Sequence, residues 1–304
     1  MKTPSFIESG SAGPVVLICA GVHGDEYEPI MACYKLLEIL RNKIISGKVV
    51  IVPYVNSSAV ALHSRCGDDG LDLARICPGN IEGSSSEKDA AGISALIKNA
   101  DYLIDMHTGG KIFDIFPLAG YMIHPSLSIL EKQREMARAF GLHVIWGTDH
   151  APEGRTLSVA RDAGVPSIYV EFGGGATVRK EIVSSYTEGC IRVLAMLGMI
   201  SDQVQVPQGL KYWTEDPTPL KGHLQSKMPS PVDGIFSAEL VLGQEVTKGE
   251  IWGHVIDVTT GTSTEVIAED TGLVLFLRSS AVVKTGDSLG GIMSISPLNR
   301  VPYD

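Results

Sequence analysis

The sequence has few cysteines and no arrangement of them that suggests a disulfide or metal site. Five cysteines are spread along the chain: Cys19, Cys33, Cys66, Cys77 and Cys190. Their odd number and the absence of a CxxC pair argue against a disulfide framework and against a cysteine zinc site. Metal ligands, if the protein has them, are therefore expected among its histidines and carboxylates.

Long apolar runs and blocks of basic residues are also missing. No segment approaches the ~18 apolar residues of a membrane-spanning helix, and residues 1–13 lack the pattern of a signal peptide. The chain has 35 acidic and 25 basic side chains, a formal charge of -10, which predicts neither nucleic acid nor membrane as a partner. We expect a cytoplasmic protein that acts on a small molecule, and we leave open whether it forms a homo-oligomer.

The chain has 304 residues, 44% of them hydrophobic, which is enough for two domains with separate cores. From residue 14 to about 200, short β-branched runs alternate with stretches of helical period. Strands are predicted at 14–20, 48–55, 101–106, 143–147 and 166–172, and helices at 28–44, 126–141, 155–164 and 177–198. This alternation predicts an α/β fold with a mixed, mostly parallel sheet flanked by helices.

The pattern changes after residues 201–222, which are rich in proline and polar residues. Beyond them the chain shows short strands and glycine turns, and residues 233–255 approximately repeat in 271–292. Such units predict a compact all-β sandwich. We therefore predict an α/β catalytic domain over 1–215 and a β-sandwich domain over 221–304.

Polar side chains occur where predicted strands end, which is where open α/β sheets bind ligands. His23 and Glu26 follow the first strand, and at i and i+3 they share one face of a helical turn. His107 follows the strand at 101–106. Two histidines and a carboxylate form a common zinc set in hydrolytic enzymes and leave a position for water. The sequence thus predicts one Zn²⁺ per chain, although manganese or cobalt can use the same ligands.

Two carboxylates are candidates to support such a site. Asp105 lies two residues before His107, on the same face of the strand, where it can orient a ligating imidazole. Glu171 ends the strand at 166–172 and can transfer protons to and from the reacting groups. The alternatives are that each histidine is simply hydrogen-bonded, and that Glu26 is a first-turn acid favoured by the helix dipole.

The irregular segment 56–80 is too long for a simple connection and carries Arg65 and Arg75. The planar guanidinium group of arginine suits bidentate binding of a carboxylate, so both are candidates for substrate binding. The alternative is that they form structural salt bridges with the acidic residues of the same segment, Asp68, Asp69 and Asp72.

Four motifs, "GVHGDE", "DLARICPG", "DMHTGG" and "VEFGGG", occur in this order. Together they resemble the succinylglutamate desuccinylase and aspartoacylase family of zinc hydrolases, relatives of the zinc carboxypeptidases. The resemblance covers nearly the whole chain, because family members also carry a C-terminal β-sandwich similar to lipoyl and biotinyl domains. It implies a zinc-dependent amidohydrolase in which His23, Glu26 and His107 bind zinc and Glu171 is the general base and acid.

The resemblance also implies roles for the two arginines. Arg75 matches the arginine of the family's "DLNR" motif and is the implied contact for a substrate carboxylate. Arg65 is the implied second contact, able to polarise the scissile carbonyl. Ala74 replaces the family's asparagine and Cys77 replaces an aromatic residue, which argues for a substrate other than N-acetylaspartate or N-succinylglutamate. We expect a small anionic N-acyl amino acid, and members with similar "HGDE" and "EFGGG" motifs deacetylate diamino acids.

Two alternatives to this function remain at the level of sequence. A carboxypeptidase-like peptidase or esterase would use the same site, and a binding protein would keep the metal but not the catalysis. A swinging-arm carrier needs a lysine at the tip of its central hairpin, and the corresponding turn, residues 258–266, has none. We therefore expect the C-terminal domain to cap the pocket or to form an oligomer contact.

Overall fold

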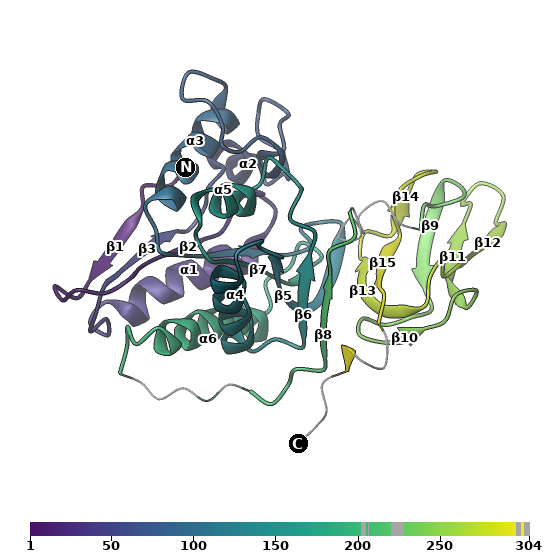
Figure 1. Cartoon of the computed structure of the whole chain (residues 1–304). Helices are drawn as coiled ribbons and strands as arrows, with labels where there is room; N and C mark the ends of the chain where they lie inside the picture. The colour runs from purple at the N-terminus through teal and green to yellow at the C-terminus, as the bar shows by residue number, and fades with distance from the viewer. Residues whose placement is uncertain (202–204, 206, 220–227, 296–298, 301–304) are drawn as a thin grey trace.

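The computed structural model describes residues 1–201, 205, 207–219, 228–295 and 299–300, and its N-terminal part is a sheet with helices on both faces (Figure 1). The strands of this part are β1 (Ser5–Glu8), β2 (Val15–Cys19), β3 (Lys48–Val52), β4 (Tyr102–His107), β5 (Phe113–Met122), β6 (Val144–Thr148), β7 (Ser167–Gly174) and β8 (Tyr212–Asp216). The helices are α1 (Tyr27–Leu40), α2 (Ser57–Leu62), the 3₁₀ turn η1 (Leu73–Arg75), α3 (Ser85–Lys98), α4 (Leu127–Phe140), α5 (Thr156–Ala163) and α6 (Lys180–Met196).

The order of the strands brings three carboxyl ends together. The sheet runs β1-β3-β2-β4-β7-β5, and β6 joins β5 to β8. Strands β3, β2, β4 and β7 are parallel to one another, whereas β5 is antiparallel to β7 and parallel to β6. The segments that follow β2, β4 and β7 therefore meet at one edge of the sheet, and these segments carry the candidate ligands.

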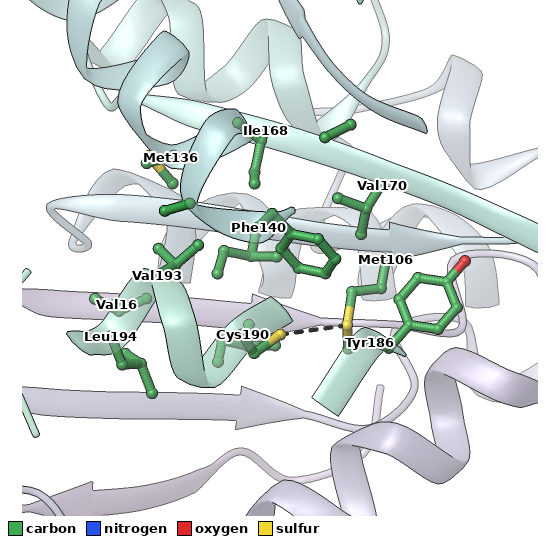
Figure 2. Close-up of a cluster of buried hydrophobic side chains, with 14 of the residues drawn as sticks. Val16, Met106, Met136, Phe140, Ile168, Val170, Tyr186, Cys190, Val193 and Leu194 are labelled. Atoms are coloured by element: carbon green, nitrogen blue, oxygen red, sulfur yellow. Dashed lines mark hydrogen bonds between the residues drawn. The ribbon is translucent and has the colours of Figure 1, made fainter. Parts of the chain in front are cut away.

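Each face of the sheet is covered by its own set of helices. Successive residues of a strand point to opposite faces, so Val16 and Ile18 pack under α1, α4 and α6, whereas Leu17 and Cys19 pack under α3 and α5. Figure 2 shows part of the first core, in which Phe140 lies among other buried apolar side chains. The predicted fold class, a mostly parallel sheet flanked by helices, is confirmed.

The predicted strands and helices are all present within a few residues, but the structure has several further elements that the sequence did not predict. The most important is β5, whose ten residues include Pro117. Proline cannot donate to a strand ladder, so the segment does not have the pattern of a central strand. The structure accommodates it by a register shift between Ile115 and Leu118. Helix α3 was also missed, although Ser84 and Glu87 form a capping box at its start.

The C-terminal part is built of strands, as predicted. They are β9 (Gly234–Ala238), β10 (Glu245–Val246), β11 (Ile251–Ile256), β12 (Ser263–Ile267), β13 (Gly272–Arg278), β14 (Val282–Val283) and β15 (Gly290–Met293). Each of the two sequence repeats contributes a short strand to the sheet of the other. In one sheet β9 pairs with β11 of its own repeat and with β14 of the second repeat. In the other sheet β13 pairs with β15 of its own repeat and with β10 of the first repeat. Trp252 is fully buried in the core between these strands.

The C-terminal part is hydrogen-bonded to the first part, because β13 pairs antiparallel with β5. The main sheet thus continues from one part into the other, beside β6 and β8 in Figure 1. The predicted domain limits at 215 and 221 lie around residues 220–227, which fall outside the described residues, so these limits stay a prediction. No helix in the described part of the chain combines the length and apolar character needed to cross a membrane.

A polar cluster fixes β8 against α4 and β5. Glu215 of β8 accepts a hydrogen bond from Nε of Arg134 (2.8 Å) and one from the hydroxyl of Tyr121 (2.6 Å). The hydrogen bonds from Arg134 and Tyr121 outweigh partial burial and hold the pKa of Glu215 below its usual value. The ionised form of Glu215 therefore stabilises the folded protein.

We predict that Glu215→Gln lowers the free energy of unfolding at pH 7 by about 1 kcal/mol, because an amide replaces a charged acceptor. The folded-state pKa is depressed, so this stabilisation is present above about pH 4 and is lost as the pH falls through the folded-state value. Urea unfolding at several pH values measures it. Glu131→Gln is the control, since Glu131 also contacts Arg134 but is 54% exposed. A difference that is independent of pH would contradict the prediction.

Candidate active site

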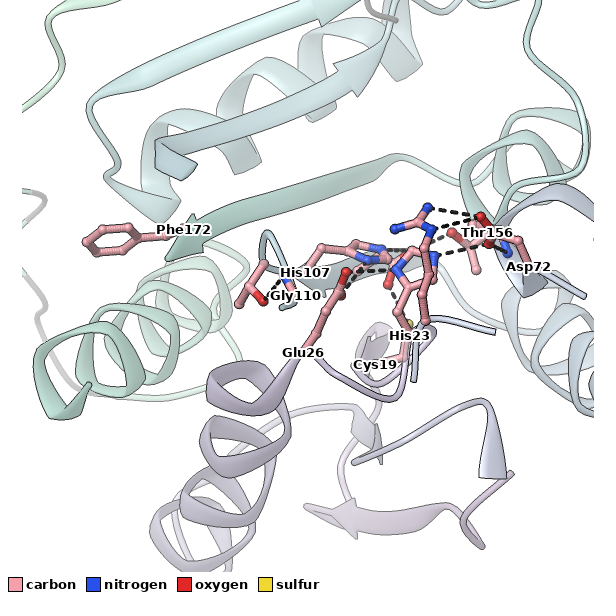
Figure 3. A network of polar contacts seen from close by, with 12 residues as sticks. Cys19, His23, Glu26, Asp72, His107, Gly110, Thr156 and Phe172 are labelled. Atoms are coloured by element: carbon pink, nitrogen blue, oxygen red, sulfur yellow. Dashed lines mark hydrogen bonds and ion pairs between the residues drawn. The ribbon is translucent and has the colours of Figure 1, made fainter. Parts of the chain in front are cut away.

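Three side chains that lie far apart in the sequence converge beyond the ends of β2 and β4 (Figure 3). Nδ1 of His23 lies 2.7 Å from Oε1 of Glu26, and Nδ1 of His107 lies 3.0 Å from Oε2 of the same carboxylate. The candidate ligand atoms all lie within 4.8 Å of one another. Glu26 directly precedes α1, so the turn from β2 into this helix brings it beside His23. The structure thus assembles the predicted set.

The remaining nitrogen of each histidine contacts a carboxylate. Nε2 of His107 lies 3.0 Å from Oδ2 of Asp105, and Nε2 of His23 lies 3.1 Å from Oδ1 of Asp72. Histidines that bind metals through one nitrogen usually donate the other N–H to a carboxylate or carbonyl, which fixes the ring and raises its basicity. Both Nδ1 atoms are therefore directed at the ligand position, and the residues fit a metal ion.

The charges of the cluster favour a cation at its centre. Burial raises the pKa of Glu26, but the two histidines outweigh it and bring this pKa down to about 2. Burial lowers the pKa of His107, yet the carboxylates of Asp105 and Glu26 raise it well above its ordinary value. Asp105 is itself fixed by the hydroxyl of Thr156 and by Sγ of Cys19 at 3.3 Å.

Glu171 lies beside the cluster because of the strand register. His107 of β4 is paired with Glu171 of β7 at the ends of these parallel strands. Burial raises the pKa of Glu171, and the neighbouring His107 only partly offsets this effect. A carboxyl group whose pKa is raised toward neutrality is suited to accept and return a proton.

Tyr186, which was not predicted from the sequence, joins β4 to β7 where the two strands end. Its hydroxyl accepts a hydrogen bond from the N–H of Phe172 at 2.7 Å and contacts the carbonyl of His107. The side chain belongs to α6 and is 1% exposed. Because tyrosine at this position of a helix is also a common core residue, its sequence pattern does not reveal the contact.

The cluster opens on a pocket of about 150 Å³. One wall is apolar and is formed by β5 and β6 together with Leu275 and Phe276 of β13. The C-terminal part thus contributes directly to the pocket. The other wall is polar and includes His23, Asp105, His107 and Glu171.

The two predicted arginines line this pocket in different ways. Arg65 donates hydrogen bonds to Oδ2 of Asp72 from Nε (3.1 Å) and Nη2 (2.9 Å). It therefore forms the structural salt bridge considered as the alternative, and it also lines the pocket. Arg75 is exposed, and its Nη1 donates to the carbonyl of Ala74 at 2.9 Å. Asp68 and Asp69 contact serines near the start of α3 instead.

A third arginine in the pocket, Arg155, was not predicted. It precedes α5 and lines the pocket beside Arg75. Burial lowers its pKa, and the positive charge of Arg75 lowers it further. The loop before α5 packs on the segment of Arg75, since Cys77 donates to the carbonyl of Gly154 at 3.0 Å. This loop contact carries no sequence signal, so spacing alone does not locate Arg155.

Residues 12–197 match the family described as the succinylglutamate desuccinylase/aspartoacylase catalytic domain. The chain is 30% identical over 297 residues to N-alpha-acetyl-L-2,4-diaminobutyric acid deacetylase of Halomonas elongata, covering 96% of this chain and 85% of that protein. The product-bound ectoine utilization protein EutE (DoeB) of Ruegeria pomeroyi superposes with a TM-score of 0.86 at 26% identity, over 95% of this chain and 87% of that one.

A succinylglutamate desuccinylase/aspartoacylase structure from Rhodobacter sphaeroides gives a TM-score of 0.84 at 26% identity, over 95% of this chain and 88% of that chain. The family match covers more than half of the chain and includes all four motifs. The resemblance inferred from these motifs is confirmed: the chain belongs to the succinylglutamate desuccinylase/aspartoacylase family.

Proposed function

We propose that the protein is a zinc-dependent deacylase that hydrolyses the amide bond of a small N-acyl amino acid. The observation that carries this proposal is the His23, Glu26 and His107 cluster, which opens with Glu171 on one small pocket. The name of the Halomonas relative, a deacetylase of an acetylated amino acid, supports the same reaction class.

The metal would be held by Nδ1 of His23, Nδ1 of His107 and the carboxylate of Glu26. When bound there, zinc supplies Lewis acidity, which lowers the pKa of water toward neutrality and polarises a carbonyl group. Asp72 and Asp105 hold the two imidazoles by their other nitrogens, so neither ring needs to turn when the ion binds.

Glu171 would carry the proton during the reaction. Its carboxylate accepts a proton from the attacking water as the new C–O bond forms at the amide carbon. It then donates that proton to the amide nitrogen as the C–N bond breaks, which releases a carboxylate and an amine. The raised pKa of Glu171 suits both transfers.

The arginines would bind and orient the substrate. Arg75, exposed at the pocket, is suited to a bidentate contact with the substrate carboxylate. Arg65 is held by Asp72, the same carboxylate that contacts His23. A guanidinium fixed in this way can stabilise negative charge that develops on the scissile carbonyl oxygen.

A peptidase or esterase with the same site is the second candidate. The apolar wall formed by Leu275 and Phe276 limits the pocket on the side of the C-terminal part, which favours a small substrate over a peptide. A protein that only binds metal would have no need for a carboxyl group with a raised pKa at the position of Glu171.

We predict that Glu171→Gln lowers kcat by about 10³-fold while zinc content stays at one ion per chain, because the amide cannot accept the proton. The measurement is amine release from a panel of N-acetyl, N-succinyl and N-formyl amino acids, with metal analysis of both proteins. Glu188→Gln is the control, since Glu188 is 63% exposed on α6. Unchanged turnover in Glu171→Gln, or a wild type without stoichiometric zinc, would refute the proposal.

We also predict that Asp105→Asn weakens zinc binding by about 10- to 100-fold, because His107 loses the carboxylate that fixes its ring. Competition with a chelator measures the affinity without reference to turnover. Asp101→Asn is a matched control just before the same strand, where the exposed side chain accepts a bond from the N–H of Val15. Equal affinity in Asp105→Asn and wild type would show that Asp105 has no part in holding the metal.

A further inference from the structure

An arginine at the start of α6 joins two strands that end at the site. Arg179 directly precedes α6, and its Nη1 and Nη2 donate to Oδ2 and Oδ1 of Asp114, each at 2.8 Å. Nη2 also donates to the carbonyl of Gly174 at 3.1 Å. Because Asp114 of β5 and Gly174 of β7 are paired in the sheet, one guanidinium group binds both strands where they meet.

The same arginine faces a buried carboxylate of α1. Glu28 is 1% exposed, and its Oε1 lies 3.6 Å from Nε of Arg179. Both atoms are buried, and within the described part of the chain neither has a hydrogen-bond partner. Glu28 lies two residues after Glu26, a candidate metal ligand. The ion pair therefore connects the first turn of α1 to the end of β7.

The glycines that follow Glu171 make room for this ion pair. Gly173 has a φ of +84°, a conformation that side chains other than glycine rarely adopt. A Cβ built at Gly173 would lie 2.9 Å from Nη2 of Arg179 and 3.4 Å from Oε1 of Glu28. The guanidinium and carboxylate groups thus pack directly against the backbone two residues beyond Glu171.

Stability alone does not explain why these charges are buried. The helix dipole favours an acid in the first turn whether or not the side chain is exposed, and well-packed apolar side chains often stabilise a protein at least as much as a buried ion pair. A buried pair does fix the geometry of the elements that it joins, because moving either group leaves a charge buried without a partner. The elements joined here carry Glu26 and Glu171.

We propose that Arg179 is a positioning residue that holds the candidate metal ligand Glu26 and the candidate proton carrier Glu171 at a fixed separation. The inference rests on the proposed function and adds to it a residue that acts through other side chains. Through Glu28, Arg179 fixes the start of α1, where Glu26 lies. Through Gly174, it fixes the end of β7, three residues beyond Glu171.

The test is Arg179→Met in the full chain, which removes the charge and every polar contact of the side chain. Loss of a nearby positive charge would by itself strengthen the binding of a cation, whereas loss of position weakens it. We expect the dissociation constant for zinc, measured by competition with a chelator, to rise by about 10-fold. At saturating zinc we expect kcat to fall by about 10-fold, because small displacements of reacting groups slow a reaction steeply. KM should stay near the wild-type value, since Arg65 and Arg75 are unchanged.

A second variant, Arg179→Lys, keeps the charge and carries the test if Arg179→Met does not fold. An ammonium group cannot form the bidentate contact with Asp114 and also serve Gly174 and Glu28. We therefore expect zinc affinity and kcat between those of the wild type and Arg179→Met. A role of charge alone would instead leave Arg179→Lys at the wild-type values.

The control is Arg134→Met on α4. Arg134 also binds a carboxylate through two nitrogens, that of Glu215, and its side chain is 26% exposed against 32% for Arg179. We expect Arg134→Met to lower the midpoint of thermal unfolding to a similar degree and to keep the wild-type zinc affinity and kcat. Activity is measured well below the unfolding midpoint of each variant, so that changes in the folded fraction do not contribute.

Three results would overturn the inference: wild-type zinc affinity and kcat in both Arg179 variants, tighter zinc binding in Arg179→Met, or an equal loss in Arg134→Met. The zinc measurements separate this inference from the proposed function. If the wild type binds zinc but hydrolyses no N-acyl amino acid, the proposed function fails and the zinc affinities alone decide the inference. If it hydrolyses them and the Arg179 variants match it, only the inference on Arg179 fails.

Discussion

The parallel pairing of β4 with β7 is the constraint on which the site depends. It places His107 opposite Glu171, so one ladder of backbone hydrogen bonds determines both a candidate metal ligand and the candidate proton carrier. A slip of one residue would turn either side chain to the opposite face of the sheet. Tyr186 strengthens this pairing, because its hydroxyl contacts the backbone of both strands just where they end.

Burying the charged side chains of the site costs free energy of folding, which explains their dense network of polar contacts. Glu26 is 2% exposed and Asp105 is 1% exposed, and burying an ionised carboxylate without partners would destabilise the protein. Each histidine of the cluster contacts two carboxylates, one at each ring nitrogen. The same contacts that compensate for burial also fix the orientation of the rings, so structural stability and readiness to bind an ion have one origin.

The sequence was sufficient for the parts of the site that follow strand ends. His23, Glu26, His107 and Glu171 could be located because strand periodicity places them at one edge of a parallel sheet. β5 could not, because Pro117 interrupts the pattern of a central strand, and β5 supplies Ile115, Leu118 and Met122 to the apolar wall of the pocket.

Arg155 escaped prediction for a different reason. It ends the loop between β6 and α5, whose path over the sheet depends on contacts with the segment of Arg75. Such contacts join residues that are distant in sequence and follow no period. The metal cluster was therefore predictable from local pattern, whereas the place of Arg155 in the pocket depends on how two loops pack.

The pairing of β13 with β5 has a consequence for how the two parts of the chain can vary. β5 contributes Ile115 and Leu118 to the pocket, and β13 contributes Leu275 and Phe276 beside them. A chain cut between the two parts would leave β5 with unpaired backbone groups, an open edge prone to pairing with other molecules. The second part is thus an integral part of the structure, because it pairs with β5 and also forms one side of the pocket. A change at this strand pair would therefore alter the sheet and the pocket together.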